Sequence, residues 1–257
     1  FVLSLLLVIG SCVGFAQTNW TLPRVAETKF KPVTFNIIQY GAVPDGHQLN
    51  TRSIQHAIGD CSKKGGGTVL VPSGLWLTGP IVLKSNVNLN LAVGSTLLFT
   101  KDKTQYPLVK ANWEGYDQMR NQSPISAEGA TNIAITGKGI IDGNGDGWRM
   151  VKKDKLTESQ WKKLVASGGI VSKDGRLWMP SEGFAKGQDM KDPGRITPDR
   201  DEAHYQSIKD FLRPNLLVLT KCDKILLEGV TFQNSPAWNL YPLMSTNITV
   251  RNIEVKN

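Results

Sequence analysis

Two polar residues near the C-terminus are the first candidates for contact with a ligand. They lie in the segment Pro236–Tyr241, where strand alternation turns Trp238 and Leu240 inward and Asn239 and Tyr241 outward. If strands stack about 4.8 Å apart, the outward pair lies next to any functional side chains of the following strand. We therefore take Asn239 and Tyr241 as candidate substrate-binding residues. The alternative is that both are ordinary solvent-facing residues of a strand.

Other chemically suggestive patterns have simpler explanations. Asn144-Gly145-Asp146 combines an amide with an acid, but it falls inside the glycine-rich turn that starts at Asp142, so we interpret it as turn chemistry. Gly65-Gly66-Gly67 follows Lys63 and Lys64 but lacks the GxxxxGK[ST] order of a phosphate loop. No metal site and no cofactor are predicted.

The element that must position these residues is a short pattern written twice. Lys224–Phe232 aligns with Asn247–Val255 at a register of 23 residues, with apolar residues at matching alternate places. A repeat of this length with strand alternation predicts stacked coils, and we expect an all-β fold, a right-handed parallel β-helix. Gly229 and Asn252 share the place where each coil bends. A β-rich domain with two similar hairpins is the alternative, but the stretch has no two-residue hairpin turns.

A short helix is expected before the coils, at about residues 51–64. Asn50 or Thr51 is the expected N-cap, and the three glycines after Lys64 end the helix. Its apolar residues recur at helical spacing, namely Ile54, Ala57, Ile58 and Cys61. Such a helix would cap the open end of the coil stack. The first coils follow in residues 67–74 and 81–91, and another begins at 132–137.

The strand pattern is interrupted at about residues 149–212. A capping box, Thr157 with Gln160, begins a helix there, and Gly168-Gly169 ends it. Between Arg149 and Arg176 there are eight Lys and Arg residues against three Asp and Glu. We interpret this basic insertion as a solvated surface that borders the binding face, with a binding stripe as the alternative.

Residues 1–16 have the apolar core of a partial secretory signal peptide. Cleavage after Ala16 would leave an incomplete β-helix domain at 17–257 and a secreted or periplasmic protein. The alternative is cleavage before Cys12, which would leave a lipid-anchored cysteine. Cys61 and Cys222 remain in either case and are expected as buried thiols. No transmembrane segment and no nucleic-acid partner are predicted, and we expect a monomer.

Several motifs together resemble one family, glycoside hydrolase family 28, the polygalacturonases. The resemblance runs from about Phe35 to Asn257 and covers the N-terminal part of such proteins. It rests on Tyr40-Gly41-Ala42-x-x-Asp45-Gly46, Leu83-Lys84-Ser85-Asn86-Val87, Gly139-Ile140-Ile141-Asp142-Gly143, Arg213-Pro214 and Asn234-Ser235-Pro236-x-Trp238.

The resemblance implies a hydrolase that cleaves α-1,4-galacturonosyl linkages in pectin, an acidic polysaccharide, with inversion of the anomeric configuration. Inversion needs a carboxylic acid and one or more carboxylates that activate water. The family supplies them from Asn-x-Asp and Asp-Asp motifs, followed by Gly-His-Gly and Arg-x-Lys. None of these catalytic motifs stands in this chain at the family's position, so we expect the catalytic residues beyond Asn257 and an inactive fragment. Many family members carry His where Tyr241 stands, which puts the role of Tyr241 in doubt.

Two other classes are the alternatives. A β-helical pectate lyase or epimerase would share the coils but lacks the Gly-Ile-Ile-Asp-Gly and Asn-Ser-Pro-x-Trp elements that this chain has. A non-catalytic β-helix that binds glycans would need no acid pair. In the polygalacturonase interpretation, the insertion at 149–212 is large enough to close one end of the groove, which favours exo action.

Overall fold

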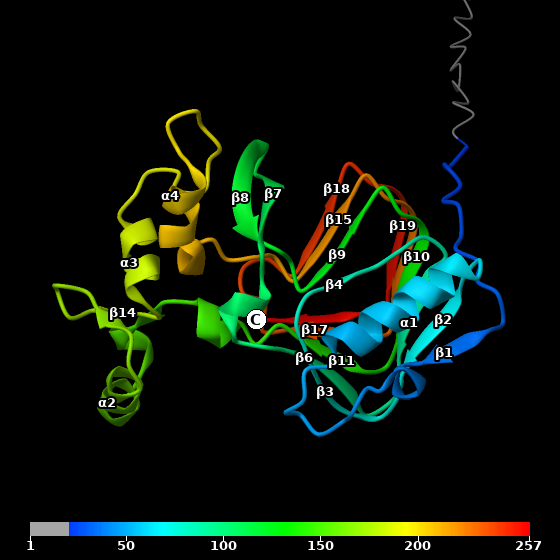
Figure 1. Ribbon diagram of the computed structural model, residues 1–257, viewed down its shortest axis with the longest axis horizontal. Helices are drawn as coiled ribbons and strands as arrows, with labels where there is room; N and C mark the ends of the chain where they lie inside the picture. The colour runs from blue at the N-terminus through cyan, green and yellow to red at the C-terminus, as the bar shows by residue number, and fades with distance from the viewer. Residues whose placement is uncertain (1–20) are drawn as a thin grey trace, which may run out of the picture.

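The chain is a right-handed parallel β-helix. The computed structural model describes residues 21–257, so the predicted signal peptide and Cys12 lie outside the described residues. Three parallel sheets run along the stack, and Figure 1 shows them side by side with the insertion to one side. The first sheet orders its strands β1 (Thr34–Asn36), β2 (Gly67–Val71), β5 (Val87–Leu91), β10 (Thr131–Gly137), β16 (Asp223–Glu228) and β19 (Thr246–Arg251). The second contains β3 (Gly74–Thr78), β6 (Ser95–Phe99), β11 (Ile140–Asp142), β17 (Thr231–Gln233) and β20 (Glu254–Lys256). The third contains β4 (Ile81–Val82), β9 (Ile125–Glu128), β15 (Leu217–Thr220) and β18 (Leu240–Leu243).

The predicted 23-residue register is confirmed. Ile225 of β16 lies opposite Ile248 of β19, and Thr231 of β17 lies opposite Glu254 of β20. Earlier coils step by 20 residues from Val69 to Leu89, by 46 from Leu89 to Ile135, and by 92 from Ile135 to Leu227. The two long steps are coils from which extra structure projects. The repeat is visible in the sequence only where nothing interrupts it.

The corners of the coils require left-handed backbone. Gly137, Gly229 and Asn252 occupy stacked positions, and their φ angles are 111°, 79° and 53°. Glycine and asparagine tolerate that region best, because a bulky side chain there clashes with the following carbonyl. The predicted bends at Gly229 and Asn252 are therefore confirmed.

One continuous apolar core fills the bore of the helix. Each sheet contributes the inward side chain of every second residue, so the same positions stack from coil to coil. Fully or almost fully buried examples are Leu89, Leu97, Ile125, Ile141, Leu217, Leu227 and Phe232. Burying a side chain of this size contributes about 1.5–3 kcal/mol. Within residues 21–257, Cys61 and Cys222 are buried free thiols, as expected.

The predicted capping helix is α1 (Thr51–Lys63), which packs on β1, β2, β4 and β5 (Figure 1). Its four predicted apolar residues are fully buried. Asn50 stands at the N-cap position but does not cap the helix. Its side chain instead accepts from Val43 N at 2.7 Å and donates to the carbonyls of Val43, Gln48 and Leu77. The buried amide thus fixes the loop that precedes the helix.

The first strand of the stack is short. β1 stops at Asn36, and a 3-10 helix covers Ile37–Tyr40. The Asn36 carbonyl Oδ1 accepts from Ile38 N at 3.0 Å, which favours the tight helical turn over continued pairing.

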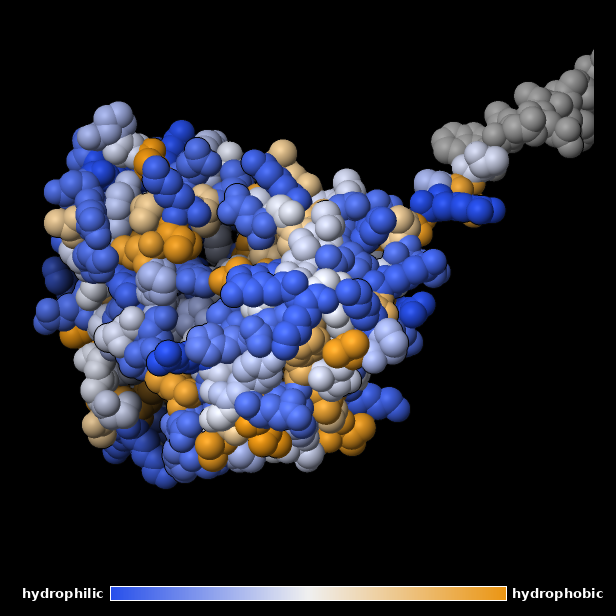
Figure 2. Space-filling view, turned by 45° about the vertical axis from the view of Figure 1, so that its right-hand side comes forward, coloured by the Kyte–Doolittle hydropathy of each residue, from blue (hydrophilic) through white to orange (hydrophobic). Residues whose placement is uncertain are grey.

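Two outgrowths leave the coils on the same side (Figure 1). The first is an antiparallel hairpin of β7 (Leu108–Trp113) and β8 (Tyr116–Asn121), which the sequence analysis did not predict. The second is the expected insertion, with α2 (Glu158–Ala166), α3 (Glu182–Gln188), α4 (Glu202–Ser207) and a small sheet of β12 (Val151–Lys152), β14 (Leu177–Met179) and β13 (Ile170–Val171). The capping box that begins α2 is confirmed. Figure 2 shows a largely hydrophilic face with small scattered hydrophobic groups.

Candidate functional site

A cleft of 350 Å³ lies between the β7–β8 hairpin and the outer face of the third sheet. The hairpin closes with Glu114 and Gly115, whose φ angles of 52° and 86° are those of a two-residue turn matched to strand twist. The insertion supports its other side, because Met119 N donates to Gly194 O and Ile196 N donates to Asp117 O. Lining residues include Trp113, Arg120, Asn121, Glu128, Asn215 and Val218. We call this hollow the hairpin cleft.

Aromatic rings form a series at the end of the hairpin cleft. Trp113 stacks on Trp238, with ring centroids 4.8 Å apart and an angle of 18° between the rings. Trp238 in turn lies 5.6 Å from Tyr241 at 54°. Trp238 is 41% exposed despite its size. Exposed, rigid aromatic faces are suited to the apolar face of a sugar ring, while the edges of the ring keep their polar contacts.

Two neighbouring arginines have no acidic partner in the described part of the chain, and one of them, Arg120, lines the hairpin cleft. The Arg120 guanidinium lies over the Trp113 ring, 3.5 Å from its centroid, and Arg120 Nη1 makes a long contact of 3.5 Å to Arg213 O. Arg213 Nη1 donates to Pro236 O at 3.1 Å. No carboxylate among residues 21–257 forms an ion pair with either guanidinium. Burial, together with the neighbouring Arg213 charge, lowers the pKa of Arg120 to about 9.

The predicted orientation of Pro236–Tyr241 is correct in part. Leu240 packs against the core, and Tyr241 pairs in register with Val218, which lines the hairpin cleft. The prediction was wrong for Trp238, which is exposed, and for Asn239, which is only 9% exposed. The reason is that β18 begins at Leu240, so alternation does not extend back to residue 238.

A turn precedes β18 and sets the direction of Trp238. Ser235 Oγ donates to Trp238 O, and Trp238 N donates to Asn215 Oδ1. Asn239 follows with a buried Oδ1 that has no hydrogen-bond partner in the described part of the chain. The substrate-binding roles of Asn239 and Tyr241 stay predictions.

The Asn144-Gly145-Asp146 segment has the structural role that we expected. Asn144 has a φ of 51° and starts a 3-10 turn, and Asp146 forms an exposed ion pair with Lys101 at 2.7 Å. Gly145 N donates to Asn234 O at 2.7 Å. A side chain at Gly145 would meet the backbone of Ser235, so the turn requires glycine.

The motifs that carry the family resemblance hold one another in place. Asp142 accepts from Gln233 Nε2 at 2.6 Å, from Asn234 Nδ2 at 2.9 Å and from Asn144 N at 2.8 Å. Arg213 bonds the carbonyl of Pro236. The Gly-Ile-Ile-Asp-Gly, Arg-Pro and Asn-Ser-Pro-x-Trp elements are therefore one contact network beneath the aromatic series, although up to about ninety residues separate them in sequence.

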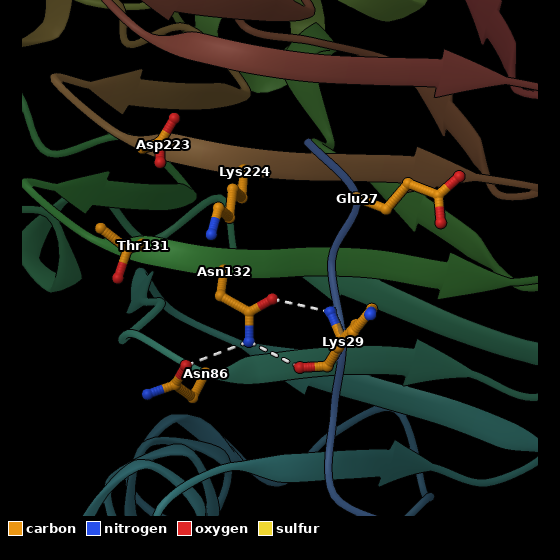
Figure 3. Close-up of a pocket in the computed structure, with 7 residues that line it drawn as sticks. All are labelled: Glu27, Lys29, Asn86, Thr131, Asn132, Asp223 and Lys224. Carbon is orange, nitrogen blue, oxygen red and sulfur yellow. Dashed lines mark hydrogen bonds between the residues drawn. The ribbon is translucent and has the colours of Figure 1, made fainter. Parts of the chain in front are cut away.

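A second hollow, of 730 Å³, lies on the first sheet under the N-terminal segment (Figure 3). Asn132 makes several hydrogen bonds there: its Oδ1 accepts from Lys29 N, and its Nδ2 donates to Lys29 O and Asn86 Oδ1. Asp223 accepts from Thr246 Oγ1 and Asn247 Nδ2. Because these polar groups satisfy one another, we assign this hollow a structural role.

Within residues 21–257, no group of three or more His, Cys, Asp or Glu side chains could hold a metal ion. Over the same residues, the helices are too short or too polar to cross a membrane.

The hairpin is the functional element that sequence reasoning missed. Its signal was present: Glu114-Gly115 separates two runs of six residues that pair in full register. Arg120 gave no local signal, because its environment depends on Trp113, Arg213 and the coil stack.

Comparisons with known proteins place the chain among its relatives. No family model matches the chain. It is 32% identical over 232 residues to an exo-poly-α-D-galacturonosidase from Dickeya chrysanthemi, a match that covers 86% of this chain and 36% of that protein. The chain thus spans little more than a third of this relative's length.

Solved structures agree with the sequence match. A hyperthermoactive exopolygalacturonase from Thermotoga maritima is 29% identical, with a TM-score of 0.63 over 90% of this chain and 48% of that one. A family 28 exopolygalacturonase from Yersinia enterocolitica is 25% identical, with a TM-score of 0.61 over 87% of this chain and 38% of that one. Over most of its length, the chain is therefore a relative of the N-terminal portion of the polygalacturonases of glycoside hydrolase family 28.

Proposed function

We propose that this chain forms the N-terminal, substrate-contacting part of a hydrolase that cuts α-1,4-galacturonosyl linkages in pectin. The observation that carries the proposal is the match over 86% of the chain to an exo-poly-α-D-galacturonosidase. The hairpin cleft supports it, because Trp113 and Arg120 line it and Trp238 and Arg213 lie next to them. Acidic sugars need both features: an apolar ring contact and a cation for the carboxylate.

The reaction proposed is inverting hydrolysis. One carboxylic acid protonates the leaving oxygen while another carboxylate activates water on the opposite face, with the two groups roughly 6.5–9.5 Å apart. The 257 residues lack the family's Asp-Asp, Gly-His-Gly and Arg-x-Lys motifs. We therefore assign this chain binding and orientation of the polymer, and assign the acid chemistry to residues outside it. Asn239 and Tyr241 are proposed to contact the sugar beside those acids.

We further propose exo action. The insertion supports the β7–β8 hairpin from behind, through Gln118 and Arg195 among other contacts, and the hairpin rises beside the cleft. Such a wall would stop the polymer at its terminal sugar. The exopolygalacturonases among the relatives favour the same assignment. In the native gene product, release of monomer or dimer in the first minutes would support the wall, whereas an early ladder of oligomers with rapid loss of viscosity would refute it.

A secreted or periplasmic monomer is the proposed form of the protein. The apolar segment at residues 1–16 supports export, with Cys12 as the position of a lipid anchor if cleavage precedes it. The measurement is fractionation of the producing cell combined with mass determination of the mature N-terminus.

Binding to trigalacturonate tests the core of the proposal. Titration calorimetry with the 257-residue chain should detect binding of trigalacturonate and no binding of neutral galactotriose. A reducing-sugar assay on polygalacturonate should detect no cleavage. Equal binding of the neutral sugar, or no binding of either, contradicts an acidic-polysaccharide function. Cleavage by this chain alone contradicts the assignment of the acids to residues outside it.

A further inference from the structure

Arg120 has the properties of a binding group that lacks its ligand. A guanidinium carries five N–H donors, yet within residues 21–257 the one hydrogen bond that Arg120 makes is a long 3.5 Å contact with Arg213 O. The Nε of Arg120 is buried and has no partner among these residues. Buried polar groups are nearly always paired, and an unpaired one requires an explanation such as a missing ligand.

The surroundings of Arg120 add positive charge. Burial and then the Arg213 charge lower the pKa of Arg120, and burial and then the Arg149 charge lower the pKa of Arg213 in turn. The Glu114 charge acts in the opposite direction, but none of the ion pairs within residues 21–257 joins Glu114 to Arg120. Like charges brought together without a counterion are unfavourable for folding, so their retention favours an anionic ligand.

The position of Arg120 is fixed. Its guanidinium lies over the Trp113 ring, 3.5 Å from the ring centroid, and Trp113 is itself stacked on Trp238. Asn121, the next residue, donates through Nδ2 to the carbonyls of Lys209 and Leu212 and thereby ties the strand to the insertion. Asn121 lines the hairpin cleft, and its buried Oδ1 has no hydrogen-bond partner in the described part of the chain.

We propose that Arg120 and Arg213 form a carboxylate-binding subsite for one uronic acid unit, with Trp113 and Trp238 against the apolar face of the sugar. This inference rests on the proposed function and specifies how its substrate is recognised. The planar fork of Arg120 is suited to two parallel hydrogen bonds with a carboxylate, a geometry that lysine cannot supply.

Substitution of Arg120 tests the subsite. We expect Arg120→Gln to weaken trigalacturonate binding about 10- to 100-fold, because a charge-assisted hydrogen-bonded contact is lost. Arg120→Lys should recover only part of the loss. Arg195→Gln is the matched control: the Arg195 guanidinium lies 4.4 Å from the Tyr116 ring centroid, is exposed, and does not line the hairpin cleft. The control should change affinity less than twofold.

Esterified substrate gives a second, independent readout. The fully methyl-esterified trimer should bind the unsubstituted chain at least about tenfold more weakly than the acid, and Arg120→Gln should abolish that preference. If Arg120→Gln does not fold, as judged by circular dichroism, the subsite is tested with the Arg120→Lys variant and with the comparison of the acid and ester trimers. Normal trigalacturonate binding by folded Arg120 variants refutes the subsite but leaves the proposed function intact. Absence of trigalacturonate binding by the unsubstituted chain refutes both.

Discussion

Substitution of Gly229 by alanine should destabilise the coil stack more than its backbone angle alone implies. Gly229 has a φ of 79°, a conformation that costs an ordinary L-residue about 1–2 kcal/mol. A Cβ at this position would also meet the Gly137 carbonyl oxygen of the neighbouring coil, which is backbone and cannot rotate away. Overpacking of this kind typically adds about 1–3 kcal/mol. The expected total loss of stability is therefore about 2–5 kcal/mol.

Gly115 is the matched control for this prediction. Its φ is 86°, close to that of Gly229, but a Cβ there would meet no heavy atom within 4 Å. Gly115→Ala should therefore show only the conformational part, about 1–2 kcal/mol. The assay is thermal unfolding of each variant followed by far-UV circular dichroism. Since 1 kcal/mol shifts the midpoint by roughly 2–4 °C in a domain of this size, the two variants should differ by about 2–12 °C. Equal losses in both variants would refute the argument that coil stacking excludes the Cβ.

Three further predictions follow from the same contacts. Asp142→Ala removes a carboxylate that accepts three hydrogen bonds, so it should lower the free energy of unfolding by about 1.5–3 kcal/mol in urea titration. Asp146→Ala should lower the free energy of unfolding by less than about 1 kcal/mol, because the ion pair of Asp146 is exposed. Burial raises the pKa of Cys61 to about 11, so this thiol and the buried Cys222 should resist a thiol reagent until urea unfolds the chain. The stability that neutral Cys61 contributes should be lost as pH rises from about 8.5 toward 11. Rapid labelling of the native protein would contradict this prediction. Tyr241→Ala should weaken trigalacturonate binding about 3- to 10-fold while Tyr241→Phe, which keeps the ring, retains most of it, and unchanged calorimetric affinity for Tyr241→Ala would assign the residue to the solvent-facing alternative.

The coil architecture could be predicted from the sequence because it depends on local rules. Alternation of side chains along a strand is a property of the backbone, and the 23-residue register appears wherever one coil follows another without interruption. The bends at Gly229 and Asn252 are equally local, since left-handed backbone restricts the residue type. The α1 helix and the capping box of α2 followed from spacing within a few residues.

The prediction for Trp238 failed because alternation applies only within a strand. Ser235 and Asn215 bond the backbone of Trp238 and place its ring on the surface before β18 begins. Asn215 comes from the preceding coil, 23 residues earlier. No pattern inside Pro236–Tyr241 carries that information.

The sequence by itself determined the coil architecture, the 23-residue register of the last two coils, the capping helix and the family to which they are related. The tertiary structure decided the hairpin cleft. Trp113 meets Trp238 across more than a hundred residues of chain, and Arg120 meets Arg213 across ninety-three, because the coils return each outgrowth to the same side of the stack. The partners of a side chain in such a cleft are set by which coils stack, and that stacking depends on burial of the whole bore and not on any short stretch of sequence.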